Sequence, residues 1–299
     1  MGLPFFNHKY ESEIINLSSS YIDDLITMSF NEDSAFDDIT TNTLLDPNIS
    51  SSCNLVAKSQ GVISGINIVK RVFELYDNTI IFKNYKTDGE DVFVNEKIAN
   101  VSGKMASILS SERVALNFIQ RMSGISTETN KLVKYISSTS AKLVDTRKTT
   151  PGYRMLDKYA VKMGGGTNHR LNLAEAVLIK DNHIEALLSD GYSLAKIIKL
   201  VRDGISSEIK IEIETESIKD AIESIEAGAD IIMLDNMSIN DMKEVVMINS
   251  GRSKLEASGG ITKDNILEIA KTGVDMISVG AITHSFASLD ISLDYDQLV

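Results

Sequence analysis

The spacing of hydrophobic positions differs between the first and second halves of the chain. Before residue 140, helically spaced apolar positions alternate with short apolar runs that are bounded by Gly and Asn. The expected helices cover 10–30, 66–76 and 105–122, the last ending near Gly124, and the expected strands cover 55–57, 80–82 and 98–101. Mixed helices and strands without a regular alternation predict an N-terminal α+β region.

After residue 140 a β-then-α pattern repeats. Strands alternating with helices predict a parallel sheet with the helices outside it, either an open doubly wound sheet or a barrel. The expected strands are Lys142–Thr146, Glu175–Lys180, Lys210–Thr215, Asp230–Asp235, Lys254–Ser258 and Asp275–Val279, and the expected helices are 153–163, 193–203, 217–227, 239–248 and 264–272.

The residues at the ends of these strands favour a barrel. In parallel α/β folds, chemistry gathers at the carboxyl ends of the strands. Here nearly every strand ends in a charged residue or a Gly/Ser turn, and no Gly-x-Gly-x-x-Gly turn follows the first of them. A ring of contributions from successive strands predicts a TIM-like barrel, with eight strands or fewer.

Net charge, hydropathy and cysteine content argue against a nucleic-acid-binding, membrane-spanning or disulfide-bonded protein. The formal charge is −12, with 30 Lys+Arg against 42 Asp+Glu, which argues against nucleic acid as a partner. No apolar run approaches the roughly 20 residues of a membrane span, and the first ten residues do not resemble a signal peptide. The single cysteine, Cys53, cannot form an intramolecular disulfide, so we expect a cytoplasmic protein.

One stretch departs from the acidic average. Between Arg147 and Lys180 the chain carries seven Lys or Arg against two acids, a local charge of +5. Clustered cations repel one another by about 4 kcal/mol at 4 Å and an effective dielectric of 20, so such a cluster predicts a bound anion. Three members, Arg154, Lys158 and Lys162, lie at helical spacing, where a solvated stripe is the expected arrangement. Arg113, Asn117 and Gln120 form another polar helical stripe for which solvent exposure is the simpler interpretation.

Acidic residues and glycine turns mark the same predicted rim. Glu214 and Asp235 end neighbouring strands and are candidates for an acid–base pair, Mg²⁺ ligands or partners of ribose hydroxyls. Glu212 alternates with Glu214 and is expected inside the barrel. As an alternative to a catalytic or ligand-binding role, the basic residues could simply neutralise these acids. The turns at 258–260 and 279–281 have small residues that let backbone N–H groups approach a phosphate. The glycines at 164–166 are either a helix end or a ligand-binding loop.

Several motifs together resemble quinolinate phosphoribosyltransferase over almost the whole chain. Three of them are Asp-Thr-Arg-Lys-Thr-Thr-Pro-Gly at 145–152, Gly-Gly-Gly-Thr-Asn-His-Arg at 164–170 and Val-Leu-Ile-Lys-Asp-Asn-His at 177–183. Shorter matches are Glu-Arg-Val-Ala-Leu-Asn-Phe at 112–118, Ser-Gly-Ile at 123–125, Glu-Ile-Glu at 212–214, Leu-Asp-Asn at 234–236 and Ser-Gly-Gly-Ile-Thr at 258–262. The segment Asp-Asp-Ile-Thr-Thr at 37–41 departs from the family, which usually has Gly where this chain has Asp37.

The resemblance implies an α/β fold in two parts: an N-terminal α+β sandwich over 1–115, joined by the C-terminal tail 282–299, and an incomplete barrel over 116–281. It implies phosphoribosyl transfer from phosphoribosyl pyrophosphate to quinolinate, with decarboxylation to nicotinate mononucleotide, a step of NAD biosynthesis. It also implies Mg²⁺ and a homodimer in which Arg113 reaches the partner's site.

Roles for site residues follow from the resemblance alone. Quinolinate would be held by Arg113, Thr146, Arg147, His169, Arg170 and Lys180. The sugar donor would be bound by Lys148, Glu214, Asp235, Ser258, Gly259, Gly260, Val279, Gly280, Ala281 and His284. Catalytic roles fall to Lys148, Lys180, Glu214 and Asp235, and Glu214 and Asp235 would also be the metal ligands.

Three other functions stay open at this point. Lys180 at a strand end would suit a Schiff-base enzyme such as an aldolase. A non-catalytic or transport-associated homologue would bind a phosphorylated small molecule without turnover. Nicotinate as the acceptor would need only one carboxylate to be recognised. A preference for quinolinate, which has two carboxylates, is instead predicted by the group Arg147, His169, Arg170 and Lys180.

Overall fold

The computed structural model describes residues 17–295, which divide into two compact units. Within the described residues, the first unit comprises 17–128, 151–165 and 286–295, and the second comprises 129–150 and 166–285. Part of the expected helix over 10–30 lies outside the described residues. The predicted domain ranges, 1–115 with 282–299 and 116–281, stay a prediction.

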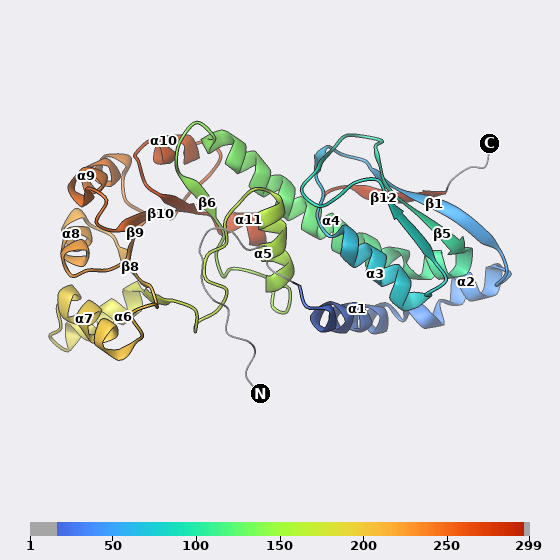
Figure 1. Cartoon of the computed structure of the whole chain (residues 1–299), viewed down its shortest axis with the longest axis horizontal. Helices are drawn as coiled ribbons and strands as arrows, with labels where there is room; N and C mark the ends of the chain where they lie inside the picture. The colour runs from blue at the N-terminus through green and yellow to red at the C-terminus, as the bar shows by residue number, and fades with distance from the viewer. Residues whose placement is uncertain (1–16, 296–299) are drawn as a thin grey trace. The chain divides into compact units, whose positions relative to one another are not determined.

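The first unit is a sheet with helices packed on one side (Figure 1). Its antiparallel sheet has the order β12-β1-β5-β3, and β2 and β4 form a separate two-stranded pair. Helix α3 places Ile68, Val69 and Phe73 in the core, and the buried face of α1, including Ile26, packs beside it. The elements are α1 (Ser19–Asp33), a 3₁₀ turn (Ala35–Asp37), α2 (Ile39–Leu44), β1 (Ser50–Ala57), β2 (Gly61–Val62), α3 (Ile66–Tyr76), β3 (Ile81–Asn84), β4 (Asp91–Val92), β5 (Lys97–Lys104), α4 (Met105–Ile136), α5 (Arg154–Met163) and β12 (Ile291–Tyr295).

Helix α4 is longer than its sequence pattern predicts, because Gly124 does not end it. The helix continues to Ile136, with Met122 and Ile125 fully buried on either side of the glycine. A Cβ at position 124 would overlap the carbonyl oxygen of Ala287 and lie 2.9 Å from Cα of Ser288. Gly124 therefore serves close packing of the backbone before β12 and is not a helix end.

Helix α5 belongs to the first unit although it lies between strands of the second. Ser126 Oγ donates to Ala160 O at 2.8 Å, and Arg121 pairs with the buried carboxylate of Asp157 at 2.9 Å. The expected solvated stripe on this helix is wrong for Lys158, which has no exposed surface. Lys158 lies on the buried face of this helix, whereas Arg154 and Lys162 keep partial exposure. The spacing of charges does not predict which face packs within the unit.

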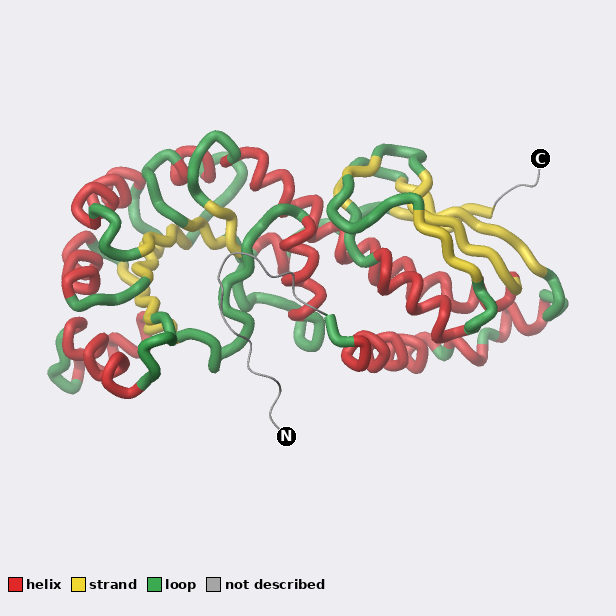
Figure 2. Tube along the Cα trace, viewed as in Figure 1, coloured by secondary structure: helices red, strands yellow, loops and turns green. Residues whose placement is uncertain are grey.

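The second unit is the predicted incomplete barrel. Its six parallel strands have the order β6-β11-β10-β9-β8-β7, with strands inside and helices outside (Figure 2). All strands follow chain order except that the last, β11, pairs with the first, β6. The strands are β6 (Lys142–Val144), β7 (Val177–Ile179), β8 (Ile211–Thr215), β9 (Ile231–Asp235), β10 (Lys254–Ser258) and β11 (Met276–Ser278), and the helices are α6 (Asp181–Ser189), α7 (Leu194–Gly204), α8 (Ile218–Glu226), α9 (Ile239–Asn249), α10 (Ile266–Ala270) and α11 (Ala281–His284).

The barrel stays open next to a short extra strand segment. Thr167 forms a parallel bridge to Val144 on the edge of β6 that β11 leaves uncovered. Its N–H donates to Leu143 O at 2.8 Å, and its carbonyl accepts from Asp145 N at 3.0 Å. The described residues of this sheet contain no pairing between Thr167 and β7. The sheet is therefore open between Thr167 and β7.

The described residues contain no helix that is both long and apolar enough to span a bilayer.

We expect Gly124→Ala to destabilise the protein by about 1–3 kcal/mol, because overpacking forces a backbone shift. The denaturation midpoint in urea measures this. Gly204→Ala is the matched control, since a Cβ there meets nothing within 4 Å in helix α7. That change should be neutral or stabilising by up to about 1 kcal/mol. Equal midpoints for the two variants would contradict the packing role of Gly124.

Candidate active site

The carboxyl ends of the barrel strands bring the predicted site residues to one rim. Arg147 and Lys148 follow β6, Lys180 follows β7, and Glu214 and Asp235 lie at the ends of β8 and β9. Because the strands are parallel, these ends face the same way. All lie in the second unit, whereas Arg154, Lys158 and Lys162 of the basic stretch lie in the first. The basic stretch is therefore divided, and four of its cations stay with the barrel.

Arg147 supplies an unsatisfied donor at this rim. Its Nε is buried and has no hydrogen-bond partner among the described residues. A buried guanidinium N–H without an acceptor destabilises the folded protein. An anionic ligand would accept this hydrogen bond and remove that penalty. Beside it, Thr146 Oγ1 accepts from Lys148 N at 3.0 Å and fixes the turn after β6. The arrangement suits recognition of a carboxylate or a phosphate.

Lys180 and Glu214 form an ion pair at the start of α6. Lys180 Nζ lies 3.2 Å from Glu214 Oε1, and Asp181 N donates to Glu214 Oε2 at 3.3 Å. His183 accepts from Lys180 N at 3.1 Å, so this histidine caps the start of the helix. The pairing shows that part of the rim's positive charge is balanced internally, as the alternative interpretation of the acids anticipates.

Two glycine turns close tightly on the neighbouring side chains. Gly259 has a φ of +87°, and a Cβ there would overlap the side chain of Asn236, next to Asp235. A Cβ at Gly280 would lie 2.9 Å from Cδ of Lys148 and 3.3 Å from Nε2 of His284. Lys148, Gly280 and His284 are thus neighbours, and Thr283 Oγ1 donates to Lys148 O at 2.8 Å. The remaining turn residues are Ser258, Gly260, Val279 and Ala281.

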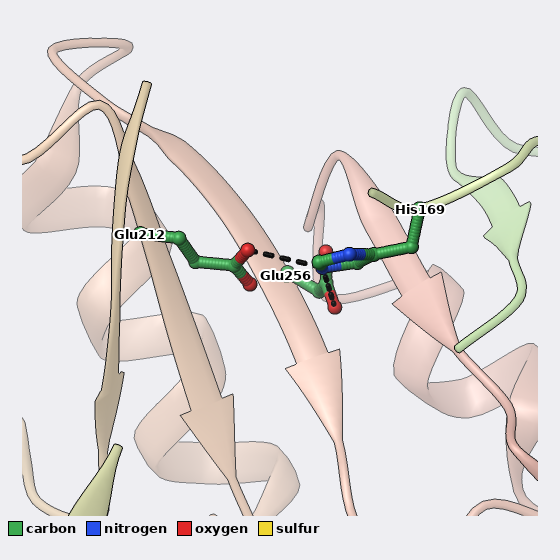
Figure 3. A group of neighbouring side chains, drawn as sticks. All are labelled: His169, Glu212 and Glu256. Atoms are coloured by element: carbon green, nitrogen blue, oxygen red, sulfur yellow. Dashed lines mark ion pairs between the residues drawn. The ribbon is translucent and has the colours of Figure 1, made fainter. Parts of the chain in front are cut away.

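A buried acidic group lies deeper in the barrel (Figure 3). The side chain of Glu212 on β8 is 3% exposed and that of Glu256 on β10 is 1% exposed, and both point toward His169. His169 Nε2 lies 3.0 Å from Glu212 Oε2 and 3.7 Å from Glu256 Oε1. The three could hold a metal ion, but 3.0 Å is an ordinary hydrogen-bond length and is explained by a proton on Nε2. Glu212 was expected inside the barrel, whereas Glu256 was missed, although it alternates with Ser258 as Glu212 does with Glu214.

Burial governs the ionisation of Glu256. The loss of water and, next, the negative charge of Glu212 raise the pKa of the Glu256 carboxyl from 4.5 to about 8. Asp145, which is also buried, adds to the upward shift in pKa. At neutral pH, Glu256 is therefore mainly the neutral acid, which reduces the charge that this interior must accommodate.

The pKa of Glu256 predicts a pH dependence of stability. Between pH 4.5 and pH 8 the folded protein holds a proton that the unfolded chain releases. Stability therefore falls as pH rises through this window, by at most about 1.4 kcal/mol per pH unit. We expect Glu256→Gln, which cannot ionise, to flatten the fall in unfolding free energy measured in urea between pH 5 and 8.

Glu244→Gln, at an exposed position on α9, is the matched control and should leave the slope as in the unmodified protein. Parallel slopes for Glu256→Gln and the unmodified protein would show that Glu256 is ionised throughout.

Arg113 is exposed on α4 in the first unit. In the same stripe, Asn117 is exposed as well, whereas Gln120 donates to Ile291 O at 2.6 Å. Within one chain, the prediction of solvent exposure is therefore confirmed for Arg113 and Asn117. It is wrong for Gln120, whose side chain contacts β12.

Comparison with known proteins identifies the family. The model of the quinolinate phosphoribosyl transferase N-terminal domain matches residues 38–123, and that of the C-terminal domain matches residues 125–294. A relative named probable nicotinate-nucleotide pyrophosphorylase [carboxylating], from Bacillus subtilis (strain 168), is 42% identical over 270 residues, 90% of this chain and 92% of the relative. The Nicotiana glauca protein named quinolinate phosphoribosyltransferase [decarboxylating] 2, mitochondrial, is 36% identical over 289 residues, 91% and 82% of the two chains.

Solved structures agree with this assignment. The nicotinate-nucleotide pyrophosphorylase from Francisella tularensis superposes with a TM-score of 0.89 at 39% identity, over 95% of this chain and 99% of that one. Human nicotinic acid phosphoribosyltransferase, at 10% identity and a TM-score of 0.57 over 94% of this chain and 74% of that one, shares the fold alone. The chain belongs to the quinolinate phosphoribosyltransferase family.

Proposed function

We propose that this chain transfers phosphoribosyl from phosphoribosyl pyrophosphate to quinolinate, with loss of CO₂ to give nicotinate mononucleotide. Family membership supports the reaction, and the observation that carries it to this chain is the unsatisfied, buried Nε of Arg147 at the rim of the barrel. An acidic protein of charge −12 that keeps Arg147, Lys148, Arg170 and Lys180 in one barrel unit is suited to small polyanions.

Quinolinate is bound through its two carboxylates. Arginine suits them because its planar fork pairs with a carboxylate through two hydrogen bonds, and lysine adds a point charge. The residues proposed for this role are Thr146, Arg147, His169, Arg170 and Lys180, with Arg113 from the partner subunit.

The sugar donor lies along the opposite part of the rim. Glu214 and Asp235 accept hydrogen bonds from ribose hydroxyls, and Lys148 faces the pyrophosphate side. The small residues of the two glycine turns let backbone N–H groups reach the 5′-phosphate. The proposed phosphate-binding residues are Ser258, Gly259, Gly260, Val279, Gly280, Ala281 and His284.

The site residues promote the reaction by positioning the two substrates and stabilising the charge that develops, and no side chain acts as a covalent nucleophile. The bond from ribose C1 to the pyrophosphate oxygen breaks, and the lone pair of the quinolinate nitrogen forms the new bond to C1. Positive charge develops at C1, and Glu214 or Asp235 stabilises it. The alkylated ring nitrogen is cationic and accepts the electron pair released when the adjacent carboxylate leaves as CO₂. Lys148 stabilises the departing pyrophosphate, and Lys180 holds quinolinate in line.

Two acids at the rim support a proposal of Mg²⁺ as the cofactor. Glu214 and Asp235 end the adjacent parallel strands β8 and β9 and offer hard oxygen donors. Mg²⁺ is commonly bound by one or two carboxylates together with substrate phosphates, so a complete protein cage is not required. We propose that these two residues would hold Mg²⁺, directly or through water; when bound, the ion would supply positive charge next to the pyrophosphate.

We further propose a homodimer that works in the cytoplasm. Arg113 is exposed on its own chain, which frees it to complete the site of a second copy. The single cysteine, Cys53, is buried, which is compatible with a reducing compartment.

The alternatives lack comparable support. Lys180 is paired with Glu214 and half exposed, not in the apolar surroundings that activate Schiff-base lysines. The relatives are named as enzymes, which disfavours a non-catalytic or transport-associated role.

Incubation with quinolinate, phosphoribosyl pyrophosphate and Mg²⁺ should yield nicotinate mononucleotide, detected by mass spectrometry. Arg147→Ala should lower kcat/KM for quinolinate by about two to three orders of magnitude, because a charge-assisted bidentate contact is lost. Arg252→Ala is the control, because Arg252 is exposed and lies between α9 and the amino end of β10, away from the carboxyl ends of the strands. Its kcat/KM should be close to that of the unmodified protein. Absence of product, or equal rates with nicotinate and quinolinate, would contradict the proposal.

Mixing Arg113→Ala with Lys180→Ala tests the shared site. Each variant alone should be inactive, whereas a hybrid dimer has one intact site, so random mixing should restore about a quarter of full activity. Native mass spectrometry verifies that hybrids form. Hybrids without recovered activity would refute the contribution of Arg113 across the interface.

A further inference from the structure

Both ring nitrogens of His169 are already engaged by the protein. Arg170 N donates to His169 Nδ1 at 2.8 Å, and Nε2 faces Glu212 Oε2 at 3.0 Å (Figure 3). A backbone N–H can only donate, so Nδ1 must offer its lone pair. The ring proton therefore lies on Nε2 and is donated to Glu212. The geometry defines a neutral imidazole with a fixed tautomer.

An imidazole held in this way has no N–H to offer a substrate carboxylate unless one of these hydrogen bonds breaks. We propose that His169 is a positioning residue that connects the buried Glu212 and Glu256 to the backbone of Arg170, and that Arg170, not His169, contacts the quinolinate carboxylate. This inference rests on the proposed function and changes the role of one member of the substrate-binding set.

The segment that carries Arg170 needs such a support. Residues 168–170 have no helix or strand of their own. The buried carboxylate of Asp145 accepts from His169 N at 2.8 Å and from Asn168 Nδ2 at 2.6 Å. Arg170 Nη1 in turn donates to Ala176 O at 2.9 Å, and the residue is 6% exposed. Arg170 is thus anchored at its backbone by His169 and at its side chain by the loop that follows.

The acidic residues behind His169 explain why this support is rigid. Glu212 and Glu256 lie on β8 and β10, separated by β9 in the sheet, and converge on Nε2 from two sides. Both oxygens of Glu256 and Oε1 of Glu212 are buried without a hydrogen-bond partner among the described residues. Rotation of the imidazole away from this site would leave Glu212 Oε2 without the Nε2 proton, which is costly in a buried environment.

Histidine NMR tests the tautomer without relying on activity. The chain has four histidines, so ¹⁵N-labelled imidazoles can be assigned with single variants, His169→Asn among them. We expect His169 to show the neutral ring with the proton on Nε2 near pH 7, both in the free protein and with saturating quinolinate. A doubly protonated ring in either state, or a proton on Nδ1, would overturn the inference.

Quinolinate affinity separates positioning from direct contact. Loss of one supporting hydrogen bond predicts that His169→Ala weakens quinolinate binding by about tenfold. In an Arg170→Ala background the same change should have little further effect, because the residue that it positions is gone. Additive losses in the double variant would instead assign His169 a contact of its own.

Conservative variants complete the test. The side chain of Asn would place an acceptor oxygen near the position of Nδ1, so His169→Asn should retain more affinity for quinolinate than His169→Ala. The KM for phosphoribosyl pyrophosphate should not change in either variant. Equal losses for Asn and Ala would contradict support through Arg170 N. If the unmodified protein binds no quinolinate, the proposed function fails, while the NMR result still decides whether His169 is the neutral link.

Discussion

The pairing of β11 with β6 is the constraint on which the barrel unit depends. A parallel sheet whose last strand returns to its first must curve, so the carboxyl ends of its strands converge on one rim. Val279 extends this pairing by donating to Val144 O at 2.9 Å, which carries the contact up to the turns after both strands. Lys148 and Gly280 become neighbours for this reason, although 132 positions of sequence separate them.

Charge in the barrel is arranged in two layers. At the rim, the Nε of Arg147 has no hydrogen-bond partner among the described residues, and Lys180 pairs with Glu214 at the end of the next strand. Below the rim, Glu212 and Glu256 are enclosed, and the raised pKa of Glu256 keeps one of them mainly neutral. Two ionised carboxylates so close together in a buried interior would repel each other strongly. The state with Glu256 protonated is therefore lower in free energy than the state with both carboxylates ionised.

The barrel strands could be predicted from the sequence to within about two residues, because buried parallel strands are short apolar runs bounded by turns. The family could also be recognised, since its motifs cluster where those strands end. Features that depend on tertiary contacts were harder to predict. Gly124 looks like a helix end but accommodates the backbone of 287–288, Lys158 looks solvated but is enclosed, and helix α6 was not expected after β7.

The same limit applies inside the site. A motif names His169 and Arg170 together and so suggests one shared role, whereas their environments differ. His169 faces two buried acids, while Arg170 is held at the edge of the barrel opening by its own backbone and by Ala176. We propose a neutral ring for His169, and such a ring adds no positive charge between the two acids, so it is proton uptake by Glu256 that limits the charge of this interior.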